Sequence, residues 1–184
     1  MLTARQIGRL IAAGDVSWHG ELRGDGLLLR LGAPLQPLVA RKSDIVDLAD
    51  QASIDRLYDA PIEEWHAFDL EVGRLVLCGV LDPLRLGPRH VGAIAGLSHL
   101  ARVGLAVHIS SPWVLPGWDG HLTLELLNSG PAPLRIYHGM PVGRLLLFTL
   151  DGRTASAAPH PFYSIGSHLG SRYAEEFPAQ PGRR

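Results

Sequence analysis

The sequence predicts a mainly β domain of jelly-roll or barrel type, preceded by one short helix. Most of the chain consists of short apolar or alternating stretches, and 21 glycines and 14 prolines supply turns between them. The beginning of the chain has a different, helical periodicity. The strand-like stretches read GDGLLLRLGAP, LEVGRLVLCGVLDPLRLGP, GLAVHISS and HLTLELLNSGPAPLRIYHGMPVGRLLLF.

Two helices are expected. In LTARQIGRLIAAG, Thr3 and Gln6 have the spacing of a capping box, apolar residues share one face, and Gly14 stands where the helix would end. A second, shorter helix is predicted over residues 50–58, because Ile54 and Leu57 are three positions apart.

Turn chemistry delimits one strand that carries an acid. Pro116-Gly117 suits the corner of a type II turn, and Asn128-Ser129-Gly130 suits the next reversal, so residues 121–127 are expected to be extended. Alternation along this strand places Glu125 on the face opposite Leu124. From the pattern alone, Glu125 is either a solvated carboxylate of an outer face or a functional acid.

The length and apolar content favour one core. The 184 residues, 46% of them hydrophobic, suit a single β domain over residues 1–158. Residues 159–184 lose the strand periodicity and are expected to form a tail, which is either a loose end or a lid.

Charge and targeting signals exclude several classes of protein. With 17 basic and 18 acidic side chains, the chain has no global attraction to nucleic acid or to an anionic membrane. It has neither a continuous apolar run of about 18 residues nor a secretory signal pattern. One cysteine rules out an internal disulfide framework, so a cytoplasmic location is expected.

The nine histidines do not form a recognisable zinc motif. HExxH, HxH and the HxE with PCxxC pattern of zinc nucleobase deaminases are all absent, as are a nucleophile elbow and a phosphate-binding glycine loop. No zinc is therefore expected. What remains is Glu125 and the segment GLSHLARVG, residues 96–104, which places a serine, a histidine and an arginine among small and apolar residues.

Residues 96–148 resemble the central block of the dCTP deaminases of the dUTPase superfamily. That family's pattern runs GRSSLARLGL, then IDPGWxGxxxLE, NSG, PGM and IGxLxF, and this chain has GLSHLARVGL, VLPGWDGHLTLE, NSG, HGM and VGRLLLF in the same order. The resemblance implies a distorted antiparallel β-barrel of dUTPase-like type. It also implies a homotrimer, with nucleotide sites at the subunit interfaces covered by the C-terminal tail.

The resemblance gives roles to individual residues. Glu125 matches the family's catalytic glutamate, which moves protons during deamination, and Ser98 and Arg102 match the serine and arginine that assist it. Further candidates for contacts with the substrate are His99, Ser110, Ser111, Trp118, Arg144, Arg172 and Tyr173.

Several residues depart from the family's pattern. Leu97 replaces an arginine that contacts phosphate, His99 replaces a serine, and the hairpin has Trp113 and Leu115 where the family has an arginine and an aspartate. His99 or Arg144 could supply a replacement positive charge.

The expected function is zinc-independent conversion of dCTP to dUTP and ammonia, with Mg²⁺ bound through the triphosphate. The main alternative is a catalytically divergent trimer that binds another nucleotide or serves as a structural module. A third alternative is a dUTPase.

Overall fold

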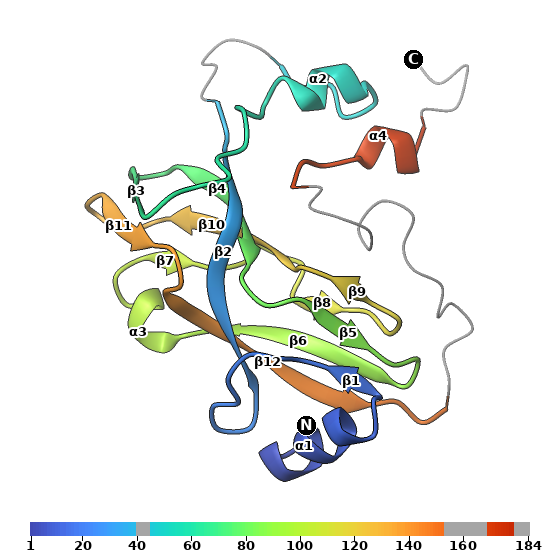
Figure 1. The fold of residues 1–184 in the computed structure, drawn as a ribbon. Helices are drawn as coiled ribbons and strands as arrows, with labels where there is room; N and C mark the ends of the chain where they lie inside the picture. The colour runs from blue at the N-terminus through green and yellow to red at the C-terminus, as the bar shows by residue number, and fades with distance from the viewer. Residues whose placement is uncertain (40–44, 153–168, 179–184) are drawn as a thin grey trace.

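Antiparallel strands are the main regular secondary structure of the molecule (Figure 1). The computed structural model describes residues 1–39, 45–152 and 169–178. Within them the helices are α1 Ala4–Ala12, α2 Gln51–Asp55, α3 Ser98–Ala101 and α4 Tyr173–Glu176. The strands are β1 Val16–Ser17, β2 Leu27–Pro37, β3 Ala67–Leu70, β4 Leu75–Val80, β5 Leu84–Leu86, β6 His90–Gly96, β7 Leu105–Ala106, β8 Trp113–Val114, β9 Asp119–Gly120, β10 Thr123–Asn128, β11 Leu134–Tyr137 and β12 Pro141–Thr149.

The strands form three antiparallel sheets. The largest has the order β7-β10-β4-β2-β12-β6-β8 and curls around the core, while β1-β5-β9 and β11-β3 form the smaller two (Figure 1). Strands β2 and β12 are therefore central, and β7 and β8 lie at the edges of the large sheet. The expectation of a mainly β, antiparallel barrel-like fold with a short N-terminal helix is confirmed.

The core is almost entirely aliphatic. Along β10, and along β12 from Gly143 to Leu147, every second residue is buried, so each strand contributes one face to it. Cys78 of β4 belongs to this core, and burial raises the pKa of its thiol to about 12. The buried polar side chains among the described residues are Ser53, His90 and Asn128.

Helix α1 begins as the sequence predicts. Thr3 and Gln6 make both bonds of the capping box, and Gly14 follows the helix with a φ of 76°, a conformation that glycine adopts without strain. Helix α2 is shorter than the 50–58 expected and is capped by Asp50, whose Oδ1 accepts from Ala52 N at 3.0 Å.

Other boundaries differ from the prediction. The stretch GLAVHISS forms a ladder only over β7, where Leu105 and Ala106 pair with Asn128 and Leu127 of β10. The proposed division between residues 158 and 159 lies outside the described residues. Of the tail, residues 169–178 are described and contain α4. No helix within the described ranges is long and apolar enough to cross a membrane.

Candidate functional site

Glu125 lies in the middle of β10, between β4 and the end of β7. Its strand neighbours Leu124 and Leu126 are fully buried, whereas Glu125 is half-buried on the other face, as the alternation predicts. Its Oε2 accepts a hydrogen bond from the main-chain N–H of Ile109 at 3.3 Å. The carboxylate is thus oriented by the segment that follows β7, and it is less exposed than an ordinary outer-face acid.

The contact with Ile109 could not be read from the sequence. In the β7–β10 ladder, Leu127 faces Ala106. If this register is continued past the end of β7, His108 falls opposite Glu125. The Nδ1 atom of His108 is buried and has no hydrogen-bond partner among the described residues. Strand alternation gives no signal for such a main-chain donor, because the partner strand is unknown until the sheet order is known.

Helix α3 carries Ser98 and His99, and Arg102 is its C-terminal cap. It begins where β6 leaves the sheet: Gly96 still pairs with Gly143 of β12, and Leu97 N donates to Val142 O at 3.1 Å. None of the α3 residues is buried. Within the part of the chain that the structure describes, the side chains of these three residues make no hydrogen bond or ion pair.

The far end of α3 is fixed to the end of β10 by two glycines. Gly104 has a φ of 94°, and its Cα packs directly against the backbone of Gly130. Ser129 donates to the carbonyl of Gly104 through both N at 2.8 Å and Oγ at 2.9 Å. Asn128 is buried, and its amide bonds Leu70 O, Ala132 O and Gly130 N. The predicted reversal at 128–130 is therefore present.

Glu125 and α3 are not joined within one chain. The α3 end meets β10 at Asn128 and the residues after it, three positions beyond Glu125, which is about 10 Å along a strand. No described hydrogen bond or ion pair links Glu125 to Ser98 or Arg102.

Arg144 lies closer to the base of α3. It pairs through its main chain with Ala95, three residues before Ser98, and with Leu28 on the other side. A Cβ atom on Gly24 would lie 3.1 Å from Nη1 of Arg144, so the guanidinium runs along the loop that precedes β2. The Nε atom of Arg144 is buried and has no hydrogen-bond partner among the described residues.

The turn of the predicted hairpin, residues 115–118, is a further place where the sequence puts a candidate site residue. Trp118 N donates to Leu115 O at 3.3 Å and Gly117 has a φ of 82°, so the predicted type II turn is present. Trp118 is half-buried and donates from Nε1 to Gly120 O at 3.1 Å. Ser110 and Ser111 are exposed and directly follow Ile109 in the segment between β7 and β8, so they belong with Glu125 rather than with this turn.

Trp113 and Leu115 are two of the most exposed large apolar side chains of the described chain, at 57% and 62%. The ring of Trp113 lies beside that of Phe148.

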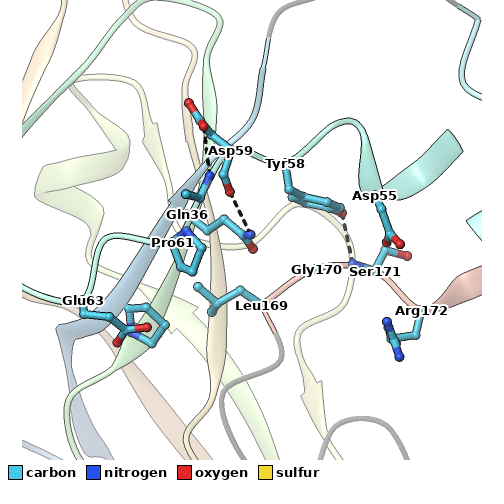
Figure 2. A pocket seen from close by; sticks show the side chains of 12 residues that line it. Gln36, Asp55, Tyr58, Asp59, Pro61, Glu63, Leu169, Gly170, Ser171 and Arg172 are labelled. Atoms are coloured by element: carbon cyan, nitrogen blue, oxygen red, sulfur yellow. Dashed lines mark hydrogen bonds between the residues drawn. The ribbon is translucent and has the colours of Figure 1, made fainter. Parts of the chain in front are cut away.

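The described part of the tail places Arg172 and Tyr173 against α2. There Arg172 contributes to a pocket of about 420 Å³ between β2, residues 55–63 and residues 169–172 (Figure 2). The lining of this pocket includes none of the other predicted site residues.

The structure therefore distributes the predicted residues over four places. The first is Glu125 with the segment after β7, the second is α3 with Arg144, the third is the hairpin with Trp118, and the fourth is the tail on α2.

Residues 1–150 match the family model described as dCTP deaminase-like. A "dCTP deaminase, dUMP-forming" of Acidothermus cellulolyticus is 36% identical over 135 residues, which cover 73% of this chain and 66% of that protein. The match to a protein of the same name from Salinispora tropica covers 60% of its length. A third, from a Nocardioides species, is 31% identical over 188 residues, covering 100% of this chain and 94% of that protein.

A solved structure shares the fold. The 2'-deoxycytidine 5'-triphosphate deaminase from Agrobacterium tumefaciens superposes with a TM-score of 0.60 at 17% identity, over 79% of this chain and 45% of that one. At this identity the likeness concerns the architecture alone. With the match of the family model over residues 1–150, the conclusion is that this chain belongs to the dCTP deaminase-like family.

Proposed function

We propose that the protein deaminates the cytosine ring of a deoxycytidine nucleotide, with dCTP as the substrate. The observation that carries this proposal is Glu125: a half-buried carboxylate, oriented by the N–H of Ile109, at the position where the family resemblance requires a glutamate. Relatives that align with 73% of this chain are named as dCTP deaminases.

The chemistry needs one group that both accepts and donates a proton. Glu125 takes a proton from water as the water oxygen bonds to C4, and it delivers that proton to N3 of the ring. A second transfer protonates the exocyclic amine, the C4–N4 bond breaks, and ammonia leaves as the C4 carbonyl forms. The balance is dCTP and water giving dUTP and ammonia.

The phosphates require a positive charge that Leu97 does not supply. Arg144 and His99 are the candidates, because both belong to the part of the molecule around the base of α3. The unpartnered Nε of Arg144 leaves this guanidinium with unused donor capacity. Mg²⁺ would accompany the triphosphate and be coordinated by its oxygens. The described residues contain no group of three or more His, Cys, Asp or Glu arranged to hold a metal ion.

The catalytic site is completed by a neighbouring subunit. Among the described residues, Glu125 makes no hydrogen bond or ion pair with Ser98 or Arg102 of its own chain, so the proposal is that α3 of one subunit faces Glu125 of the next in a homotrimer. This arrangement is the one that the family resemblance implies.

The two candidate products are dUTP and dUMP. Leu115 stands where the wider superfamily uses an aspartate to position the water that attacks the phosphate chain, which favours dUTP as the product. The relatives' names favour a second candidate, in which dUTP goes on to dUMP and pyrophosphate.

The test is incubation of the protein with dCTP and Mg²⁺, followed by chromatographic separation of dCTP, dUTP and dUMP. Wild-type protein should form uridine nucleotide, and Glu125→Gln should lower the rate by about 10²- to 10⁴-fold because it removes the proton carrier. Glu71→Gln, at an exposed position, is the matched control and should keep wild-type activity. Absence of turnover by the wild-type protein, or full activity of Glu125→Gln, contradicts the proposal.

A further inference from the structure

The C-terminal segment Leu169–Phe177 is docked on α2 and on the residues that follow it. Ser171 N donates to the hydroxyl of Tyr58 at 3.1 Å (Figure 2). Gln51 Nε2 donates to Ser171 O at 2.7 Å. Gly170 lies against the ring of Tyr58, because a Cβ atom built on Gly170 would be 3.5 Å from the nearest ring carbons of Tyr58. Leu169 and Ala174 are each only 8% exposed. The segment is thus held by two hydrogen bonds and two buried side chains.

The surface that holds the segment, called the dock below, consists of α2 and residues 56–59. It is joined to the large sheet by hydrogen bonds. Val39 N donates to Leu57 O at 2.7 Å, and Asp59 N donates to Pro37 O at 3.0 Å, so the residues after α2 run beside the end of β2. Gln36 of β2 donates to Asp59 O at 3.0 Å. Figure 1 shows α4 beside α2, at the end of the molecule opposite α1.

The surroundings of the docked segment are acidic. The pocket beside it is lined by the carboxylates of Asp55, Asp59 and Glu63, and the one cationic side chain in its lining is Arg172. Arg172 is moreover engaged by Glu175, with Nε 3.0 Å from Oε2. A triphosphate would be repelled by these carboxylates. The docked position of Arg172 is therefore not a position in which it can contact the phosphates of a nucleotide.

We propose that α2 is a docking site that holds the C-terminal segment away from the nucleotide, so that docking and nucleotide binding compete. For Arg172 and Tyr173 to reach a triphosphate, Ser171 must give up its bonds to Tyr58 and Gln51. The segment then has two positions, and the nucleotide shifts the population from one to the other. This inference rests on the proposed function, because it takes the phosphates of a nucleotide as the competing partner.

Two variants weaken the dock without touching the nucleotide. Tyr58→Phe removes the hydroxyl that accepts from Ser171 and keeps the ring, and Gln51→Ala removes the donor to Ser171 O. Tyr137→Phe is the matched control, since Tyr137 is an exposed residue of β11 whose ring contacts His66 and which belongs neither to the docked segment nor to α2.

The first measurement is amide hydrogen exchange of residues 169–177 in the protein without nucleotide. Exchange should be faster in Tyr58→Phe and in Gln51→Ala than in the wild-type protein, and unchanged in Tyr137→Phe. Equal exchange in all four proteins overturns the docked position. This comparison needs no turnover, so it judges the dock independently of the proposed activity.

The second measurement is the apparent dissociation constant for dCTP. Each dock variant should bind dCTP about two- to tenfold more tightly, because the loss of one hydrogen bond releases the segment from a competing state. Unchanged or weaker binding by both variants overturns the competition. If the wild-type protein neither binds nor converts dCTP, the proposed function fails and the competition fails with it, while the exchange comparison still decides whether the segment docks.

Discussion

At the scale of single residues, what surrounds a side chain decides its chemistry. Glu125 was identifiable in the sequence from strand alternation and from the family pattern: alternation alone left a solvated carboxylate and a functional acid open, and only the family pattern gave Glu125 a catalytic role. The structure adds that Glu125 is half-buried and that its carboxylate accepts a hydrogen bond from Ile109 N, while its catalytic role stays a prediction. The main-chain donor comes from a segment 16 residues away along the chain.

His90 is a second residue whose surroundings matter, because it is 3% exposed. Burial lowers the pKa of His90 below its ordinary value of 6.5; Asp15 opposes this effect and Arg89 adds to it. The unfolded chain therefore binds a proton at His90 more readily than the folded chain does. Its contribution to the free energy of unfolding is complete above pH 6.5 and is lost as the pH falls through the lower, folded pKa.

We expect the urea midpoint of the wild-type protein to decrease between pH 7.5 and pH 5, and His90→Gln to show a shallower decrease, because glutamine does not titrate. Urea denaturation at several pH values measures this. His19→Gln, at an exposed position, should retain the wild-type slope. Identical slopes for His90→Gln and the wild-type protein would show that His90 does not couple to stability.

At the scale of elements, the close approach of Gly104 to Gly130 joins α3 to the end of β10. A side chain at Gly104 would both strain a φ of 94° and push into the backbone of Gly130. We expect Gly104→Ala to lower the free energy of unfolding by at least about 2 kcal/mol, from backbone strain together with overpacking.

Gly73→Ala separates the two causes of that loss. Gly73 has a φ of 72° but nothing within 4 Å of its Cβ position, so alanine there should cost only the backbone strain, about 1–2 kcal/mol. Denaturant unfolding of both variants measures the difference. Equal losses would mean that the contact between the two glycines contributes nothing beyond their backbone conformations.

The sequence predicted those elements whose signals are local. The capping box at Thr3 and Gln6, the turn at Pro116-Gly117 and the reversal at Asn128 each depend on a few neighbouring residues, and each is present. Strand ends were predicted less well, as in the stretch 104–111, because the length of a ladder depends on its partner strand. Contacts such as that between Ser171 and Tyr58 join residues more than a hundred positions apart and have no local signal.

At the scale of the whole molecule, a single chain leaves the proposed site divided and part of its surface apolar. Ile109, Trp113 and Leu115 are each more than half exposed within seven residues. They belong to the segment that begins with Ile109, the main-chain donor to Glu125. Exposed apolar residues concentrated in this way are typical of a protein interface. A neighbouring subunit would cover them and could bring its own α3 to Glu125.

Mixed trimers test this division directly. Glu125→Gln and Arg102→Ala should each be inactive alone. When subunits of the two variants are dissociated, mixed in equal amounts and reassembled, an interface is intact only if Glu125 comes from the Arg102→Ala subunit and α3 comes from the Glu125→Gln subunit. About a quarter of the interfaces meet this condition. We therefore expect about a quarter of the wild-type deaminase activity to return.

A mixture of Ser98→Ala with Arg102→Ala is the control, because every α3 in it carries a defect and no site is restored. If native mass spectrometry shows that subunits have exchanged and the first mixture is still inactive, Glu125 and α3 do not act across an interface. A monomeric mass for the wild-type protein would contradict the same prediction, because Glu125 would then have no second α3 to face.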